Sequence, residues 1–145
     1  MNCEAGNSPA NVSAFLDSFT EWARLQPDIE GVVLVGSYAR GEPQPDSDVD
    51  LVILTPRTDQ YLRDRSWLSL FGKVAECREE SYGRMTSIRS HYVSGLEVEF
   101  GFSTSAWAAT PIDTGTLNVV SQGMKVLHDP NGLIARMQDG LNCSS

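Results

Sequence analysis

The chain has 145 residues, 41% hydrophobic and 21% charged, which is ordinary globular composition and excludes a fibrous or largely disordered protein. One domain around one hydrophobic core is expected at this length. Eleven basic and nineteen acidic residues give a net charge of −8, and no basic stripe is visible, so we expect no nucleic acid partner.

The sequence also bears on where the protein works. No stretch approaches the ~20 apolar residues that a membrane span needs, and the N-terminus lacks the features of a signal peptide. Cys3, Cys77 and Cys143 are odd in number and far apart, so we interpret them as reduced thiols. We therefore expect a cytoplasmic protein with no membrane partner. Residues 9–141 are predicted as a single domain, between flexible ends at residues 1–8 and 142–145.

The first predicted element is an amphipathic helix over residues 9–25, because six apolar residues recur at helical spacing. Ser8-Pro9 supplies a helix cap followed by proline at the first helical position. The six residues are Val12, Phe15, Leu16, Phe19, Trp22 and Ala23.

Two apolar strands are predicted next, over residues 31–36 and 49–54. The segment between them is rich in glycine, proline, serine and aspartate, so the strands can pair as neighbours with this loop at one end of the sheet. A functional site is expected at that end.

The rest of the chain mixes both kinds of element. A helix is predicted over residues 61–71, closed by Gly72, and strands over residues 73–80, 86–93 and 96–102, with Ser94-Gly95 as a hairpin turn. A helix from residue 111 through 120, a strand at 125–127 and a final helix after residues 129–132 follow. This order indicates an α/β or α+β fold in one unit.

Arginines are interspersed with acidic residues through the middle of the chain, and we interpret this mixture as solvent-exposed surface. No stripe of one sign results. These arginines are Arg57, Arg63, Arg65, Arg78, Arg84 and Arg89.

The most informative segment links the two apolar strands. Gly36 and Ser37 end the first strand, where free backbone N–H groups and a hydroxyl can bind phosphate. Asp48 and Asp50 are two residues apart at the start of the second, so their carboxylates leave the same face. Such a pair becomes favourable around a hard divalent cation such as Mg²⁺.

A second acidic strand face carries Glu97 and Glu99. If this strand lies beside the one bearing Asp48 and Asp50, a third carboxylate completes a two-metal site. Each feature alone has a simpler interpretation, as a turn, a solvated strand edge or a hydrated sheet face. Their order and spacing together favour the site.

Gly36-Ser37, ten intervening residues and Asp48-Val49-Asp50 resemble the signature of the DNA polymerase beta-like nucleotidyltransferase superfamily. Its small members include minimal nucleotidyltransferases and the catalytic domains of aminoglycoside and lincosamide nucleotidyltransferases. The resemblance is firm over residues 31–55 and extends to about residue 103. It implies a mixed β-sheet flanked by helices, the nucleotidyltransferase fold.

The resemblance also implies roles for individual residues. Gly36 and Ser37 would hold the phosphates of a nucleoside triphosphate, with Arg40 supporting the triphosphate or the loop. Asp48 and Asp50 would be catalytic metal ligands. The third carboxylate of the family usually precedes a hydrophobic residue, which favours Glu99, followed by Phe100. Glu97 is the alternative.

The implied enzyme is a Mg²⁺-dependent nucleotidyltransferase that moves a nucleoside monophosphate, AMP from ATP in the first instance, to a hydroxyl acceptor and releases pyrophosphate. An aminoglycoside-like molecule is the leading acceptor because an acidic domain attracts a polycation. At this length we expect an acceptor site that is shallow, shared across a homodimer or supplied by a partner. The alternative is an antitoxin-like minimal nucleotidyltransferase that binds or adenylylates a helical partner protein.

Two roles stay open in the sequence. Neither His91 nor His128 has a partner at a telling spacing, so no general base is assigned, although Glu97 is a candidate. Trp67, Trp107 and Tyr82 can stack a purine, but each is more often a packing residue.

Overall fold

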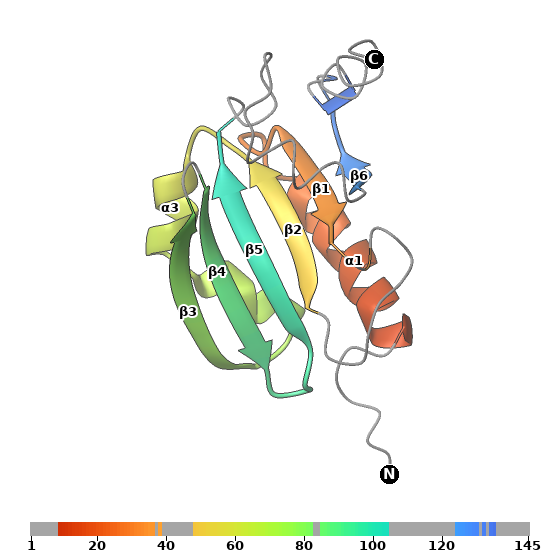
Figure 1. Cartoon of the computed structure of the whole chain (residues 1–145), viewed down its shortest axis with the longest axis vertical. Helices are drawn as coiled ribbons and strands as arrows, with labels where there is room; N and C mark the ends of the chain where they lie inside the picture. Colours follow the sequence, from red (N-terminus) through yellow and green to blue (C-terminus); the bar gives the residue numbers. More distant parts are fainter. Residues whose placement is uncertain are drawn as a thin grey trace.

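The computed structural model describes residues 9–36, 38, 48–82, 85–104, 124–130, 132 and 134–135. Within them, one six-stranded sheet has the strand order β3-β4-β5-β2-β1-β6 (Figure 1). The elements are α1 (Pro9–Arg24), β1 (Gly31–Val35), β2 (Val49–Leu54), α3 (Thr58–Arg63), the 3₁₀ helix η1 (Ser66–Phe71), β3 (Val74–Tyr82), β4 (Met85–Tyr92), β5 (Glu97–Ser103) and β6 (Met124–His128).

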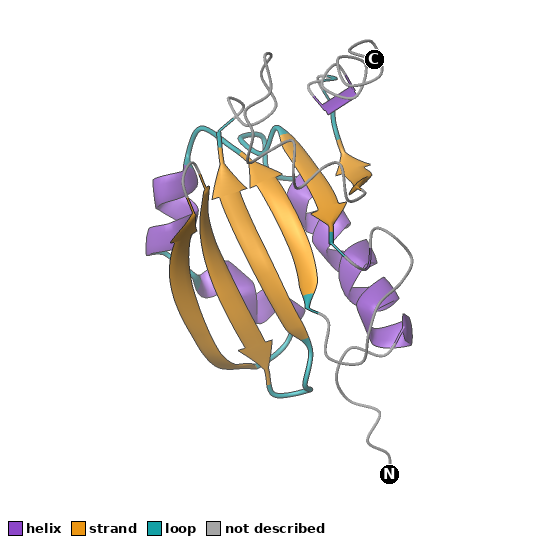
Figure 2. Ribbon diagram, in the orientation of Figure 1, coloured by secondary structure: helices purple, strands orange, loops and turns teal. Residues whose placement is uncertain are grey.

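The sheet is mixed, as expected from the order of elements. β2 and β5 pair in parallel, whereas the other neighbouring strands pair antiparallel. Figure 2 shows α1, α3 and η1 on one side of this sheet. Because β2 and β5 run the same way, residues at the starts of both strands lie at one end of the sheet.

The larger part of the core fills the space between the helices and one face of the sheet, and a smaller buried cluster that includes Val52, Leu54 and Ile134 lies on the other face. Alternation along β5 sends Val98, Phe100 and Phe102 into the larger part, and all three are essentially buried. The indole ring of Trp67 meets the ring of Phe100 edge to face, with centroids 4.9 Å apart. Trp67 Nε1 donates a hydrogen bond of 3.0 Å to the carbonyl oxygen of Tyr61.

Trp67 is therefore a core residue and not a platform for a purine. Its indole satisfies its only donor inside the protein and is 7% exposed. The side chain of Tyr82 and the whole of Trp107 lie outside the described residues.

The predictions for the first half of the chain are confirmed closely. Strand β2 matches its predicted range, whereas α1 ends at Arg24 and β1 at Val35, each one residue earlier than predicted. β1 and β2 are indeed neighbours, with Val35 opposite Asp50.

The prediction of one continuous helix over residues 61–71 is wrong. The chain forms α3, then leaves helical geometry at Asp64, which is extended, and re-forms a turn as η1. The Asp64 carboxylate accepts a hydrogen bond of 3.1 Å from the N–H of Ser66, which starts the new turn. Arg65 Nε donates to the carbonyl oxygen of Leu62 at 2.7 Å, so the side chain caps the end of α3.

A hairpin turn is confirmed at Ser94-Gly95, but it has three residues, since Val93 also lies between Tyr92 and Leu96. The N–H of Tyr92 donates to the carbonyl oxygen of Leu96 at 2.9 Å, and Gly95 adopts a φ of 96°, which glycine reaches without strain. The predicted strands on either side correspond to β4 and β5, and the strand before them to β3.

The C-terminal part is described only in places. The predicted strand at 125–127 is confirmed as β6, which pairs with β1. Ile134 and Ala135 are helical, and their N–H groups donate to the Asp129 carboxylate at 3.1 and 3.0 Å, as at a helix start. The predicted helix over 111–120 lies outside the described residues. None of the helices described is long and apolar enough to cross a membrane.

Replacing Trp67 by alanine should lower the free energy of unfolding by about 3–5 kcal/mol, because it empties the centre of the aromatic core. Leu70→Ala in the same 3₁₀ helix is the control, since Leu70 is 62% exposed. It should cost less than about 0.5 kcal/mol. Denaturant unfolding of both variants provides the comparison, and equal losses would contradict this description of the core.

Candidate active site

Asp48 and Asp50 stand at the start of β2, on the sheet face opposite α1, α3 and η1. Alternation along β2 buries Val49 and Leu51 against the helices and turns Asp50 the other way. Asp50 is partly buried, as is Asp48 just before the strand. The apolar residues of β2 thus anchor the strand while its acids face outward at one end.

The third carboxylate comes from the neighbouring strand. β2 and β5 pair in parallel with Asp50 opposite Glu99, which confirms that the two acidic strands are adjacent. Carboxylate oxygens of Asp48, Asp50 and Glu99 lie within 4.8 Å of one another. These three residues form the carboxylate cluster.

Glu97 lies outside this cluster. Its Oε1 is 3.9 Å from Nδ1 of His91, the residue opposite it on β4. Among the described residues the cluster contains Glu99 and not Glu97. This geometry favours Glu99 as the third ligand.

Gly36 follows β1 and lies against the cluster because β1 is antiparallel to β2. Its φ is 80°, a conformation that favours glycine. A Cβ at this position would be 2.6 Å from Oδ2 of Asp50. The missing side chain therefore leaves the space that the Asp50 carboxylate occupies.

The other two predicted phosphate-binding residues, Ser37 and Arg40, lie outside the described residues. Tyr38 is described and half-buried, and burial together with the charge of Asp48 raises the pKa of its phenol. Tyr38 therefore lies close enough to Asp48 to be affected by its charge.

The negative charges of the carboxylate cluster favour binding of a cation. Burial raises the pKa of Asp50 to about 7, and the negative charges of Glu99 and Asp48 add to the shift, while Arg89 opposes it. Three carboxylates so close together repel one another unless positive charge is present. Clustered carboxylate oxygens are the donors that hard divalent cations prefer, so these residues fit Mg²⁺.

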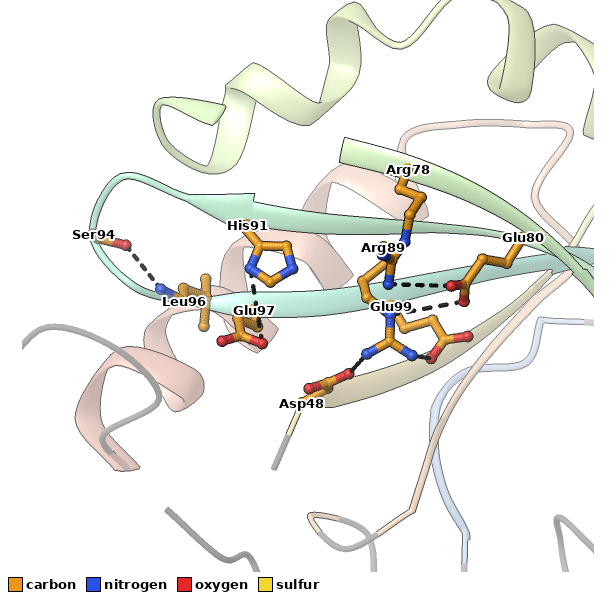
Figure 3. A network of polar contacts seen from close by, with 9 residues as sticks. All are labelled: Asp48, Arg78, Glu80, Arg89, His91, Ser94, Leu96, Glu97 and Glu99. Atoms are coloured by element: carbon orange, nitrogen blue, oxygen red, sulfur yellow. Dashed lines mark hydrogen bonds and ion pairs between the residues drawn. The ribbon is translucent and has the colours of Figure 1, made fainter. Parts of the chain in front are cut away.

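Arg89 on β4 supplies positive charge inside the site. Its Nη1 donates to Oδ2 of Asp48, and its Nη2 donates to Oε1 of Glu99 at 3.0 Å (Figure 3). Its side chain is 25% exposed. The interpretation of Arg89 as part of a solvent-exposed mixed surface is therefore wrong.

The contact between Arg89 and Glu99 depends on the register of the hairpin that joins β4 and β5. A hairpin centred on Ser94 pairs residues equally distant from it, so Arg89 faces Glu99 and His91 faces Glu97. The predicted two-residue turn at Ser94-Gly95 would instead set Ser90 opposite Glu99 and His91 opposite Val98, so it gives the neighbouring strands but not these pairs. The spacing of residues along the chain does not show which residues face each other across two strands. The sequence analysis therefore finds no partner for His91, which faces Glu97.

The sequence also matches a model of a known protein family. The family model of the nucleotidyltransferase domain matches residues 18–90, half of the chain. The chain belongs to the nucleotidyltransferase domain family. The match includes Gly36, Asp48, Asp50 and Arg89 and ends before Glu99.

Solved structures are similar to this nucleotidyltransferase domain, and of the following three one has a TM-score above 0.5. An aminoglycoside 6-adenyltransferase from Bacillus subtilis is 17% identical with a TM-score of 0.53, covering 65% of this chain and 35% of its own. A cytoplasmic RNA terminal U-transferase and the Cid1 poly(U) polymerase are each 21% identical, with TM-scores of 0.49 and 0.48, covering 68% of this chain and 32% of their own. At such identities the likeness concerns the fold alone.

The present chain thus spans about a third of the length of these proteins. No curated protein matches it significantly.

Gly36→Ala should weaken binding of a divalent cation, because the new Cβ would push the Asp50 carboxylate out of the cluster. Gly132→Ala is the matched control: its φ of 70° brings similar backbone strain, and no described atom lies within 4 Å of the added Cβ. The strain alone should cost each variant about 1–2 kcal/mol.

The measurement is the rise in melting temperature on adding Mg²⁺ or Mn²⁺. Gly132→Ala should keep the wild-type rise, and Gly36→Ala should lose most of it. An equal rise in both variants would contradict the role assigned to Gly36.

Proposed function

We propose that this domain is a Mg²⁺-dependent nucleotidyltransferase that moves AMP from ATP to a hydroxyl acceptor and releases pyrophosphate. The observation that carries the proposal is the carboxylate cluster, assembled from β2 and β5 beside Gly36 in a chain of the nucleotidyltransferase domain family.

In this proposal Asp48, Asp50 and Glu99 hold two metal ions through the oxygens that face one another. When bound, such ions would activate the attacking oxygen and stabilise the leaving pyrophosphate. The protein itself contributes rigid positions. Asp50 and Glu99 are fixed in register by the parallel pairing of two strands whose other faces are buried in the core.

The triphosphate is proposed to lie along the segment after β1. Gly36 provides backbone close to the cluster, and Ser37 and Arg40 are proposed to bind phosphate oxygens, as the family resemblance implies. The acceptor oxygen forms a bond to the α-phosphorus and loses its proton. The bond from that phosphorus to the bridging oxygen breaks, and pyrophosphate leaves with the electron pair.

An acidic sheet face supports a cationic acceptor such as an aminoglycoside. Strand registers place further carboxylates on the face that carries the cluster, namely Glu76 and Glu80 of β3 and Glu97 of β5. Acids outnumber the arginines on this face, Arg78 and Arg89, so it attracts a small polycation more readily than a phosphate backbone.

We also propose that the reaction takes place in the cytoplasm. Cys77 is exposed and is a free thiol. Exposed free thiols are typical of reducing compartments.

The third ligand can be tested by comparing two conservative variants. Glu99→Gln should slow transfer about 10²-fold or more, because it removes a charge that acts on the reacting phosphate through the bound ions. Glu97→Gln, two residues away on the same strand face, should slow transfer much less, because Glu97 pairs with His91 outside the cluster.

The assay follows label from the α-phosphate of ATP into a panel of aminoglycosides, together with release of pyrophosphate. A greater loss in Glu97→Gln would move the third ligand to Glu97. Transfer that persists at the wild-type rate in Asp50→Asn would rule out the proposed site.

A further inference from the structure

Arg89 is surrounded by acidic residues from three neighbouring strands. Its guanidinium bonds Asp48 at the start of β2 and Glu99 on β5, and its Nε is 3.8 Å from Oε1 of Glu80 on β3 (Figure 3). Asp48 and Glu99 are each only 17% exposed in their side chains, so solvent screens these contacts incompletely. Charge-assisted hydrogen bonds of this kind are the strong ones in proteins.

The same carboxylates serve two purposes. Asp48 and Glu99 are two of the three members of the carboxylate cluster and are also the acids that Arg89 bridges. A divalent cation that draws in oxygens from both acids must weaken or replace their bonds to the guanidinium. Arg89 and the cation therefore compete for the same negative charge.

We propose that Arg89 is a displaceable counter-ion, which neutralises the carboxylate cluster when no metal is bound and lowers its affinity for a divalent cation. This inference rests on the proposed metal site. It makes Arg89 a positioning residue, which acts on metal binding through Asp48 and Glu99.

Glu80 provides the place to which the guanidinium can withdraw. Its Oε1 faces Arg89, while its Oε2 already bonds Nη2 of Arg78 at 3.2 Å. Glu80 is thereby held from the β3 side, next to the cluster but outside it. When Asp48 and Glu99 turn to a cation, Arg89 keeps an acidic partner without moving into solvent.

The direct test is a calorimetric titration of the nucleotide-free protein with Mn²⁺. Arg89→Gln removes the competing charge and should bind Mn²⁺ about tenfold more tightly than the wild type, as expected for one unit charge at contact distance. A structural role alone would not tighten metal binding.

Arg78→Gln is the matched control. It removes one positive charge from the same sheet face and from the same Glu80, but Arg78 is 62% exposed, and among the described residues Asp48 and Glu99 form their ion pairs with Arg89. Its Mn²⁺ affinity should stay near the wild-type value because exposed charges are well screened.

Thermal unfolding supplies a second readout. In EDTA, Arg89→Gln should melt below the wild type, because the carboxylates are left without their counter-ion. Saturating Mn²⁺ should close most of this gap. If Arg89→Gln does not fold, Arg89→Lys replaces it, since lysine keeps the charge but cannot bridge two carboxylates with a planar fork. That variant should also bind Mn²⁺ more tightly than the wild type.

The outcomes are distinct. Equal or weaker Mn²⁺ binding in Arg89→Gln, with the wild type binding normally, overturns the counter-ion proposal and leaves the metal site in place. Equal tightening in Arg89→Gln and Arg78→Gln also overturns it, because the effect would then be one of overall charge. Absence of Mn²⁺ binding in all the folded proteins overturns both the metal site and this inference.

Discussion

Repulsion among three neighbouring carboxylates is the constraint on which the site depends. Oxygens of Asp48, Asp50 and Glu99 lie within 4.8 Å of one another, and burial with mutual repulsion raises the pKa of Asp50 to about 7. Folding such a group costs free energy that other parts of the structure must offset. Arg89 offsets part of it, and a bound divalent cation would offset more.

The fold holds these acids together by burying the opposite face of the same strands. β2 and β5 are pinned by residues such as Leu51 and Phe100, which face the helices and the aromatic core. Because a strand alternates its side chains, fixing one face also fixes the other. The parallel register then places Asp50 beside Glu99.

The site is thus an outcome of core packing as much as of the polar residues. Gly36 also contributes, because the Asp50 carboxylate occupies the space that a Cβ at position 36 would take. A residue far from the reaction, such as Trp67, contributes by keeping β5 in position through its contact with Phe100.

Helices and strands whose side chains follow a regular period along the chain are predicted correctly from the sequence. The apolar stripe of α1, the β-branched runs of β1 and β2 and the acids at alternate positions each follow from local periodicity. The helix over 61–71 was predicted wrongly because hydrogen bonds from the side chains of Asp64 and Arg65 interrupt it, and periodicity does not register such bonds.

Arg89 was missed for a different reason. Its role arises from partners on three other strands, and only the register of the β4–β5 hairpin brings Glu99 opposite it. The order of charges along the chain does not distinguish Arg89 from Arg78, which lies opposite it on β3 and whose side chain is much more exposed. From a single sequence, the residues that can form a site are easier to predict than the ion pairs that neutralise their charges.

The central claim is that the carboxylate cluster binds a nucleoside triphosphate through a divalent cation, and calorimetry tests it most directly. ATP, GTP, CTP and UTP would each be titrated with and without Mg²⁺ into the wild type and a folded Asp48→Asn/Asp50→Asn variant. We expect Mg²⁺-dependent binding to the wild type, with ATP preferred, that disappears in the variant. Binding that is equal in both proteins, or that is unaffected by Mg²⁺, would contradict the account.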